Sequence, residues 1–288
     1  MLQVARLAPT LLGESSALVD DFVRSLIHED GGFRDREGKS DLYYTVFGIE
    51  CLQALQAEVP VDRIVGFLDS FSDGDGLDLV HLACLTRCLA ALSGVEASPD
   101  RTRALLANVE RFRTPDGGFR NEPGARTGTA YGCFIALGLY QDIGVELPHV
   151  DRVTQFLETM ATPDGAYANE ASMTMGTTPT TAAAVTFLRN LGAAQRPESA
   201  DWLEARCQAE GGFLAMPQAP MPDLLSTATA IHALAGLQRP LDAIKEPCLD
   251  FIDTLWTNRG GFYGNWADND LDCEYTYYGL LALGHLSL

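Results

Sequence analysis

A repeating unit is the feature of this sequence that most constrains its fold. Six segments share a Gly-rich turn, a variable polar stretch and a run of small and apolar residues, and they recur every ~45 residues. The clearest turns read EDGGF, TPDGGF, TPDGAY, AEGGF and NRGGF. Self-similarity at such a period is typical of proteins built from stacked helical hairpins. The chain is therefore expected to fold as six copies of one helical unit.

Two kinds of helix alternate along these repeats. Amphipathic segments, with apolar residues at helical spacing and charges between them, are typical of an outer layer; they are VDRIVGFLDSF, SPDRTRALLANVERF, PHVDRVTQFLETM and PLDAIKEPCLDFIDTLW. The segments TTAAAVTFLRNL and TATAIHALAGL are apolar on nearly every side, as expected for an inner layer. No strand-like alternation of useful length occurs, so the sequence predicts an all-α protein.

Six outer and six inner helices could form either an open solenoid or a closed ring. The terminal repeats of a solenoid usually differ from the internal ones, and neither end of this chain carries a polar capping repeat. We therefore expect one domain over residues 1–288, an (α/α)6 barrel (toroid) whose sixth inner helix packs beside the first. The six repeats are predicted at residues 14–57, 58–94, 95–142, 143–192, 193–238 and 239–288.

Composition excludes several classes of partner. The chain has 20 basic and 39 acidic residues, a net charge of −19 that disfavours nucleic acid and anionic membranes. No apolar run approaches the roughly 20 residues that span a bilayer, and Arg6 and Pro9 interrupt the first segment before it could serve as a signal-peptide core. The cysteines are odd in number and form no CxxC motif, which disfavours a disulfide framework or a zinc ribbon. We expect a soluble, cytoplasmic protein with no membrane insertion.

The repeats resemble those of the protein prenyltransferase β subunits and the related terpenoid cyclases of the squalene-hopene type. The resemblance rests on GGF followed by a polar Asp and a (Y)T helix, is close in GGFRDREGKSDLYYTVFGIECL, and covers residues 14–288. It implies an (α/α)6 barrel with an apolar central cavity for an isoprenoid, entered where the Gly-rich loops lead into the inner helices. Because β subunits of this family dock on an α subunit, an α-subunit-like or homo-oligomeric partner is implied as well.

The metal site of the prenyltransferases is not preserved. Those enzymes hold zinc with an Asp-x-Cys at one inner-helix start and a His at the next. The corresponding residues here are Asp223, Leu224 and Leu225, and Tyr275 stands in the position of the His. Leucine cannot ligate a metal and tyrosine does so rarely, so zinc is not expected. Of the three cations that bind the diphosphate in the family only Arg126 remains, which predicts weak diphosphate binding in the usual pose.

Acidic residues recur at the predicted starts of the inner helices. Aligning the repeats on the inner-helix leucine places six residues at equivalent positions: Asp41, Asp78, Arg126, Thr177, Asp223 and Asp272. In a closed ring these positions face one another around the entrance, where like charges raise one another's pKa. The simpler interpretation is that each Asp caps its own helix.

Asp272 is distinguished by Glu274, two residues later. Class II terpenoid cyclases carry Asp-x-Asp-Asp at this point of an inner helix, and the local run Asp272-Cys273-Glu274-Tyr275 matches the spacing of two of those acids but lacks the third. The resemblance implies that Asp272 and Glu274 are catalytic acids that protonate an alkene. The alternative is a cap at Asp272 beside a solvated Glu274. A third interpretation joins Asp41 to these two acids as oxygen ligands of Mg²⁺ at the rim. No other cofactor is expected.

Aromatic residues gather near the same helix starts. Aromatic walls hold a polyene and stabilise carbocations, although ordinary packing between two layers would require the same residue types. The candidate substrate-binding residues are Tyr44, Phe47, Arg126, Tyr131, Asp223, Trp266, Tyr275 and Tyr278.

Three functions stay open from the sequence. The first is an isoprenoid-handling enzyme that resembles the prenyltransferase β subunits and acts on a prenyl or polyprenyl substrate. The second is a class II-type terpenoid cyclase that uses Asp272 and Glu274 as its acids. The third is a non-catalytic toroid that binds a lipid or a helical partner. The resemblance favours an enzyme whose small-molecule partner is an isoprenoid.

Overall fold

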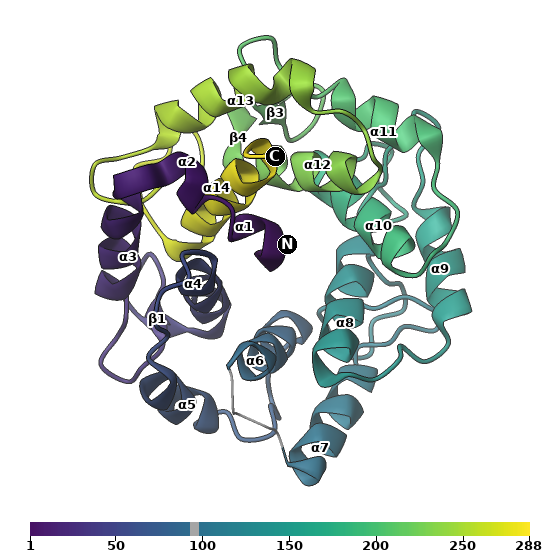
Figure 1. Cartoon of the computed structure of the whole chain (residues 1–288). Coiled ribbons are helices and arrows are strands. Elements are labelled where there is room, and N and C mark those ends of the chain that lie inside the picture. Colours follow the sequence, from purple (N-terminus) through teal and green to yellow (C-terminus); the bar gives the residue numbers. More distant parts are fainter. Residues whose placement is uncertain (93–97) are drawn as a thin grey trace.

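The helical hairpins form a closed ring in the computed structural model, which describes residues 1–92 and 98–288 (Figure 1). The inner helices are α4 (Leu42–Ala54), α6 (Leu79–Ala91), α8 (Ala130–Ile143), α10 (Thr178–Asn190), α12 (Leu224–Gly236) and α14 (Cys273–Leu286). The outer helices are α3 (Ser16–Ser25), α5 (Val61–Asp69), α7 (Pro99–Glu110), α9 (Val150–Thr159), α11 (Pro197–Glu204) and α13 (Asp242–Leu255). The expected boundary between the second and third repeats, at residue 94, lies outside the described residues.

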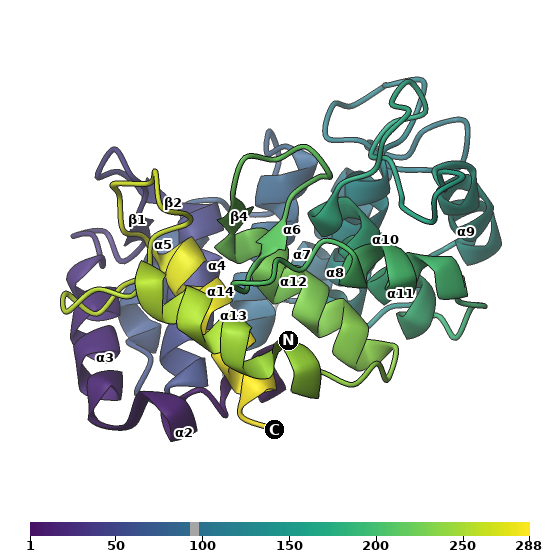
Figure 2. The same ribbon diagram turned by 90° about the horizontal axis from the view of Figure 1, so that it is seen from above.

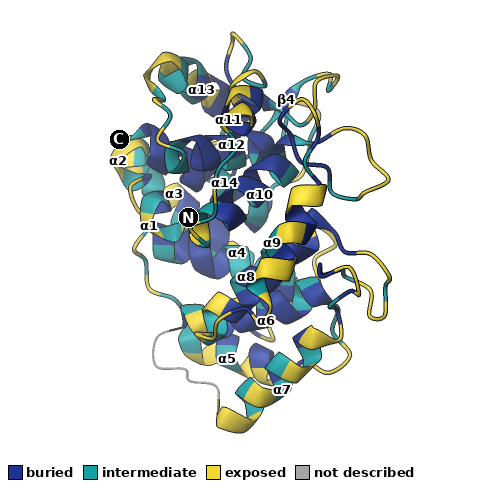
Figure 3. Ribbon diagram, turned by 90° about the vertical axis from the view of Figure 1, so that its right-hand side faces the viewer, coloured by how far each residue is buried: buried dark blue, intermediate teal, exposed yellow. Residues whose placement is uncertain are grey.

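Closure of the ring brings the last inner helix against the first, which confirms the predicted all-α toroid. The Cys51 thiol on α4 lies 3.5 Å from the carbonyl oxygen of Cys273 on α14. One turn along, the Phe47 ring packs against the rings of Tyr277 and Tyr278, with centroid distances of 5.8 and 5.6 Å. The inner helices are therefore buried on both sides, by the outer layer and by their neighbours, whereas α7 and α9 expose their outward faces (Figure 3).

Each inner helix begins at a residue whose side chain accepts a hydrogen bond from a first-turn amide; these N-caps are Asp41, Asp78, Thr129, Thr177, Asp223 and Asp272. The capping interpretation of Asp41, Asp78 and Asp223 is thus confirmed. The sequence alignment is wrong in the third repeat, because Thr129 caps α8 and Arg126 lies three residues earlier in an exposed loop. Such a cap stabilises a helix by about 1 kcal/mol.

A buried threonine ties the Gly-rich turn to the helix that follows it. Thr45 Oγ1 accepts a 2.9 Å hydrogen bond from the amide of Phe33 and donates a 2.6 Å hydrogen bond to the Asp41 carbonyl. The same segments pair as a short antiparallel hairpin of β1 (Phe33–Arg34) and β2 (Ser40–Asp41), with Phe33 opposite Asp41. A second such hairpin joins β3 (Phe213–Leu214) and β4 (Pro222–Asp223). These contacts give the Thr of the (Y)T motif its structural role.

Glycines of the Gly-rich turns pack closely against the backbone of the next outer helix. Gly31 has a φ of 101°, and a Cβ on it would lie 2.0 Å from the carbonyl oxygen of Arg63 in α5. At the other end of the chain, Gly260 has a φ of 92°, and a Cβ on it would lie 2.0 Å from the carbonyl oxygen of Leu18 in α3. Only glycine fits at both positions, because they need a positive φ and contact with a neighbouring backbone. The last turn therefore docks on the first outer helix and closes the outer layer.

The N-terminal segment lies across one end of the ring (Figures 1 and 2). It comprises α1 (Leu2–Ala5), α2 (Pro9–Leu12) and the 3-10 turn Gly13–Ser15. The α1 backbone packs on α14, where a Cβ on Gly284 would lie 2.1 Å from the Val4 carbonyl oxygen. We call this end the floor and the opposite end, where the inner helices begin, the rim. Within residues 1–92 and 98–288, no helix has the length and apolar character needed to cross a bilayer.

Candidate functional site

A cavity of about 640 Å³ occupies the centre of the ring, a size within the range of small-molecule sites. The inner helices form its walls, and Met1 and Leu2 contribute to its floor. The middle of the wall is apolar and aromatic, with Val46, Phe47, Cys84, Phe134, Ala183 and Tyr278. Polar residues stand at both ends: Tyr43 and Glu274 at the rim, and Glu50, Arg87, Asp142 and Arg189 at the floor. The cavity thus has one hydrocarbon-like belt between two polar ends.

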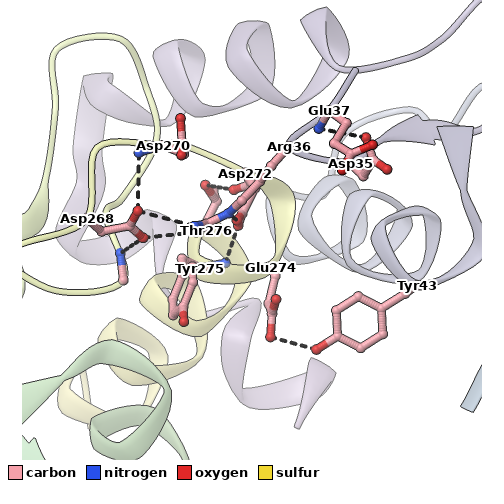
Figure 4. A network of polar contacts seen from close by, with 11 residues as sticks. Asp35, Arg36, Glu37, Tyr43, Asp268, Asp270, Asp272, Glu274, Tyr275 and Thr276 are labelled. Atoms are coloured by element: carbon pink, nitrogen blue, oxygen red, sulfur yellow. Dashed lines mark hydrogen bonds and ion pairs between the residues drawn. The ribbon is translucent and has the colours of Figure 1, made fainter. Parts of the chain in front are cut away.

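Glu274 is the acid of the rim that lines the cavity. Its Oε1 accepts a 2.6 Å hydrogen bond from the hydroxyl of Tyr43, across the junction of α14 and α4 (Figure 4). Burial raises the pKa of Glu274 to about 7, and the nearby charge of Asp272 adds to this rise while the Tyr43 hydrogen bond opposes it. A protonated carboxyl is therefore well populated at neutral pH, within the cavity.

Asp272 is held away from the cavity by its own contacts. The side chain is only 2% exposed; Oδ1 accepts a 2.8 Å hydrogen bond from the Tyr275 amide, and Oδ2 accepts one of 2.7 Å from Arg36 Nε (Figure 4). Arg36 also forms an ion pair with Asp268 at 2.9 Å. Burial raises the pKa of Asp272, while the Tyr275 amide and the guanidinium act in the opposite direction. Asp272 and Glu274 therefore have separate partners, and Asp272 anchors the loop before α14.

Asp41 is bound to His81, which joins the first two inner helices. The imidazole lies between two carboxylates, with Nε2 3.3 Å from Asp41 and Nδ1 2.8 Å from Asp78. The hydrogen bond to Asp41, with that to Asp78, raises the pKa of His81 to about 9. The ring is thus protonated at neutral pH and donates to both acids, so this cluster is a charged clamp between α4 and α6.

The structure does not bring the acids considered for Mg²⁺ together. Asp41, Asp272 and Glu274 are bound by His81, Arg36 and Tyr43 in turn. Among the described residues, no three or more His, Cys, Asp or Glu side chains are grouped so that they could hold a metal ion.

The residues at the position of the family zinc site do not fit a zinc ion. Both oxygens of Asp223 are used within α12, because they accept hydrogen bonds of 2.7 Å from the amide and the hydroxyl of Ser226. Burial raises the pKa of Asp223. Its neighbour Leu225 and the ring of Tyr275 supply none of the thiolate and imidazole ligands that zinc prefers.

The candidate substrate-binding residues divide between the cavity and its surroundings. Phe47, Tyr131 and Tyr278 line the cavity. Three others lie at the rim but do not line the cavity: Tyr44, Asp223 and Tyr275. The Arg36 guanidinium lies over the Tyr275 ring, 5.3 Å from its centroid. Trp266 is 55% exposed and donates a 2.8 Å hydrogen bond to the Thr254 hydroxyl, while Arg126 is exposed in its loop.

Sequence reasoning missed the charged residues of the floor and the arginine at the rim. Glu50 and Arg87 are single charges in the otherwise apolar helices LYYTVFGIECLQA and LVHLACLTRCLAA. A charged side chain in a helix that is buried on all sides must face either a partner or a cavity. This signal could have identified both Glu50 and Arg87. Arg36 lies in a polar loop with many other charges, so nothing in the sequence singles it out.

Comparisons with known proteins agree with this architecture. The family model described as the prenyltransferase alpha-alpha toroid domain matches residues 15–81, 69–178 and 181–287. None of the curated proteins searched matches the chain. Three similar solved structures show the fold at low identity.

The apo type II terpene cyclase MstE from Scytonema has a TM-score of 0.63 and 14% identity, over 100% of this chain and 98% of that one. An MstE variant in complex with its substrate geranylgeranyl dihydroxybenzoate has a TM-score of 0.67 and 13% identity, over 97% of both chains. An α-1,6-mannanase from Salegentibacter has a TM-score of 0.64 and 12% identity, over 95% of this chain and 98% of that one. The fold is thus shared by proteins with different chemistries.

Proposed function

The chain belongs to the prenyltransferase alpha-alpha toroid family, and from this premise we propose that it is a terpenoid-cyclase-like enzyme in which the Glu274 carboxyl protonates an alkene of a prenyl compound. One observation carries the proposal. The acid that faces the central cavity is buried, has a pKa raised to about 7, and stands at the end of an aromatic and apolar belt. An acid that keeps its proton beside a hydrocarbon-like space is placed to act as a general acid toward an alkene.

The proposed step transfers the Glu274 proton to one carbon of a C=C bond. The π electron pair forms the new C–H bond, and the adjacent carbon becomes a carbocation. The π pair of a second alkene then attacks that carbon and forms a ring C–C bond. Loss of a proton from the final cation to a base ends the reaction, which is an isomerisation with no net change in atoms.

Two kinds of side chain assist this step. The Tyr43 hydroxyl donates its hydrogen bond to Glu274, and it stabilises the carboxylate that remains once the proton has left. Aromatic faces along the cavity stabilise positive charge through their quadrupoles. Those rings are Tyr43, Phe47, Tyr131, Phe134, Tyr277 and Tyr278.

Two rival chemistries are less well supported. Thiol prenylation would need a zinc site, which the residues around Asp223 do not fit. Hydrolysis of a polysaccharide, the activity named for the mannanase relative, would need polar walls along the sugar, whereas the belt between rim and floor is aromatic and aliphatic. The substrate named for MstE carries a prenyl chain, and we propose the same class of chain for this protein.

The test is turnover of linear prenyl compounds, followed by mass spectrometry of the products. We expect the full chain to convert geranylgeraniol or geranylgeranoic acid into isomers of equal mass. Glu274→Gln should lower the rate by roughly 10²–10⁴-fold, the usual contribution of a general acid. The matched control is Glu37→Gln, because the Glu37 side chain is 74% exposed on a rim loop. Equal rates for Glu274→Gln and the control would reject the acid; binding without isomerisation by the full chain would indicate a carrier.

A further inference from the structure

The floor of the cavity holds two arginines with different surroundings. Arg87 on α6 is compensated by two carboxylates, since its Nε lies 3.0 Å from Asp142 and its Nη1 lies 3.8 Å from Glu50. Arg189 on α10 lines the same cavity, and none of the carboxylates in residues 1–92 and 98–288 lies within ion-pair distance of it. One positive charge at the floor therefore has no counter-charge from the described part of the chain.

The polar residues beside Arg189 do not supply that counter-charge. His232 lines the cavity on α12, and its Nδ1 lies 2.9 Å from Nε2 of His285 on α14. Burial lowers the pKa of these rings to about 3 and about 4, and the positive charges of the Met1 amino group and of Arg189 contribute in the same direction. Both imidazoles are thus neutral near pH 7 and form a hydrogen bond with each other. A neutral pair can accept or donate a hydrogen bond but cannot neutralise a guanidinium.

A glycine on the neighbouring helix makes room for the Arg189 side chain. A Cβ on Gly236, near the end of α12, would lie 1.9 Å from Nη1 of Arg189 and 2.8 Å from its Cζ. The guanidinium therefore lies against the α12 backbone, in a notch that any other residue would fill. Gly236 has an ordinary helical backbone, so this close approach is the structural reason for a glycine there.

Rim and floor are separated by the length of the aromatic belt. Glu274 is two residues past the N-cap of α14, and Arg189 is twelve residues past the N-cap of α10. Both side chains line the same cavity, Glu274 from the first turn of its helix and Arg189 from the last turn. The cavity could therefore hold an extended chain with one end at each site.

We propose that Arg189 binds a carboxylate head group of the prenyl substrate at the floor, so that the hydrocarbon chain fills the aromatic belt and its far alkene lies beside Glu274. The presence of a prenyl substrate and its orientation in the cavity rest on the function proposed above. A single uncompensated guanidinium matches one carboxylate and can bind it through two parallel hydrogen bonds. A diphosphate carries more negative charge than one guanidinium can neutralise, and the Met1 amino group, the other cation near Arg189, has a pKa that burial lowers.

The test compares two ligands that share one chain, geranylgeranoic acid and geranylgeraniol, by calorimetric titration of the full-length Glu274→Gln protein at pH 7.5, where no turnover interferes. We expect the acid to bind roughly tenfold to a hundredfold more tightly than the alcohol, the usual range for one charge-assisted contact. Adding Arg189→Met should abolish this preference. Adding Gly236→Ala should reduce it while the arginine is retained, because the new methyl group displaces the guanidinium. Arg126→Gln, which removes an exposed arginine, is the matched control and should leave the preference intact.

Each other outcome rejects a defined part of the proposal. Equal affinity for acid and alcohol, or a preference that survives Arg189→Met in a protein with an unchanged melting temperature, would overturn the carboxylate site and leave the role of Glu274 standing. Arg189-dependent binding of geranylgeranyl diphosphate tenfold tighter than the acid would overturn the choice of a carboxylate. If neither geranylgeranoic acid nor geranylgeraniol binds, the proposed function is rejected, and the head-group site with it.

Discussion

At each end of the cavity, one charged side chain of the lining lacks an opposite charge among the described residues: an acid at the rim and an arginine at the floor. At the rim, Arg36 neutralises Asp272, and His81 neutralises Asp41 and Asp78, whereas Glu274 has only the neutral hydroxyl of Tyr43. At the floor, Arg87 has two carboxylates, whereas Arg189 has none among the described residues. Compensated charges hold the ring together, and the two exceptions are the groups able to act on a ligand.

The largest change in stability is expected when the rim is loosened without any change in charge. Gly260→Ala would place a methyl group on a residue with a φ of 92°, against the Leu18 carbonyl oxygen that closes the outer layer. We expect a loss of about 3 kcal/mol in the free energy of unfolding, measured by urea denaturation. Gly66→Ala is the matched control, because its Cβ would meet nothing within 4 Å in α5; it should be neutral or stabilise the protein by up to about 1 kcal/mol. Equal losses would show that the closing turn is not special.

A medium-sized effect, on the pH dependence of turnover, is expected when the hydrogen bond from Tyr43 to Glu274 is removed. Turnover should fall as the pH rises through about 7, because the required protonated form of Glu274 is lost. Tyr43→Phe removes a donor that holds the pKa of Glu274 down, so the falling limb should move to higher pH. The maximal rate should drop about tenfold, because the carboxylate left after proton transfer loses a hydrogen bond. Tyr44→Phe, outside the cavity lining, should leave the limb in place. An unmoved limb in Tyr43→Phe would contradict the assignment.

The smallest effect is expected from the charged clamp at the rim. The folded-state pKa of His81 is about 9, above the value of about 6.5 in an unfolded chain. Its stabilisation is therefore fully present below pH ~6.5 and is lost as the pH rises through about 9. Because the side chain is 37% exposed, we expect His81→Gln to cost about 1 kcal/mol or less at pH ~6, and still less at pH ~9.5. A cost that grows with pH would contradict this description of the clamp.

The ring could be predicted from sequence because each repeat carries its own local signals. A Gly-rich turn and a polar capping residue mark where each inner helix begins, and the capped positions are correct in five of six repeats. The error at Arg126 has a local cause: the capping position of the third repeat is a threonine, Thr129, and not an aspartate.

The cavity floor could not be predicted in the same way. Its residues come from the third and fourth turns of different inner helices, and only the closed ring shows which helix faces meet. Arg87 on α6 forms an ion pair with Asp142 on α8, and Arg189 on α10 lies against Gly236 on α12. Nor does the sequence predict that Met1 and Leu2 line the floor, since that placement depends on packing against α14.

The most direct test of the central claim is the isotope content of the product formed in D₂O. If Glu274 starts the reaction by protonating an alkene, each cyclised molecule should carry one non-exchangeable deuterium, seen as a mass increase of about 1 Da with retention of every prenyl carbon. That deuterium should be located on the carbon at which protonation occurs. A cyclised product without deuterium, or a product in which the chain has been transferred to an acceptor, would contradict the account.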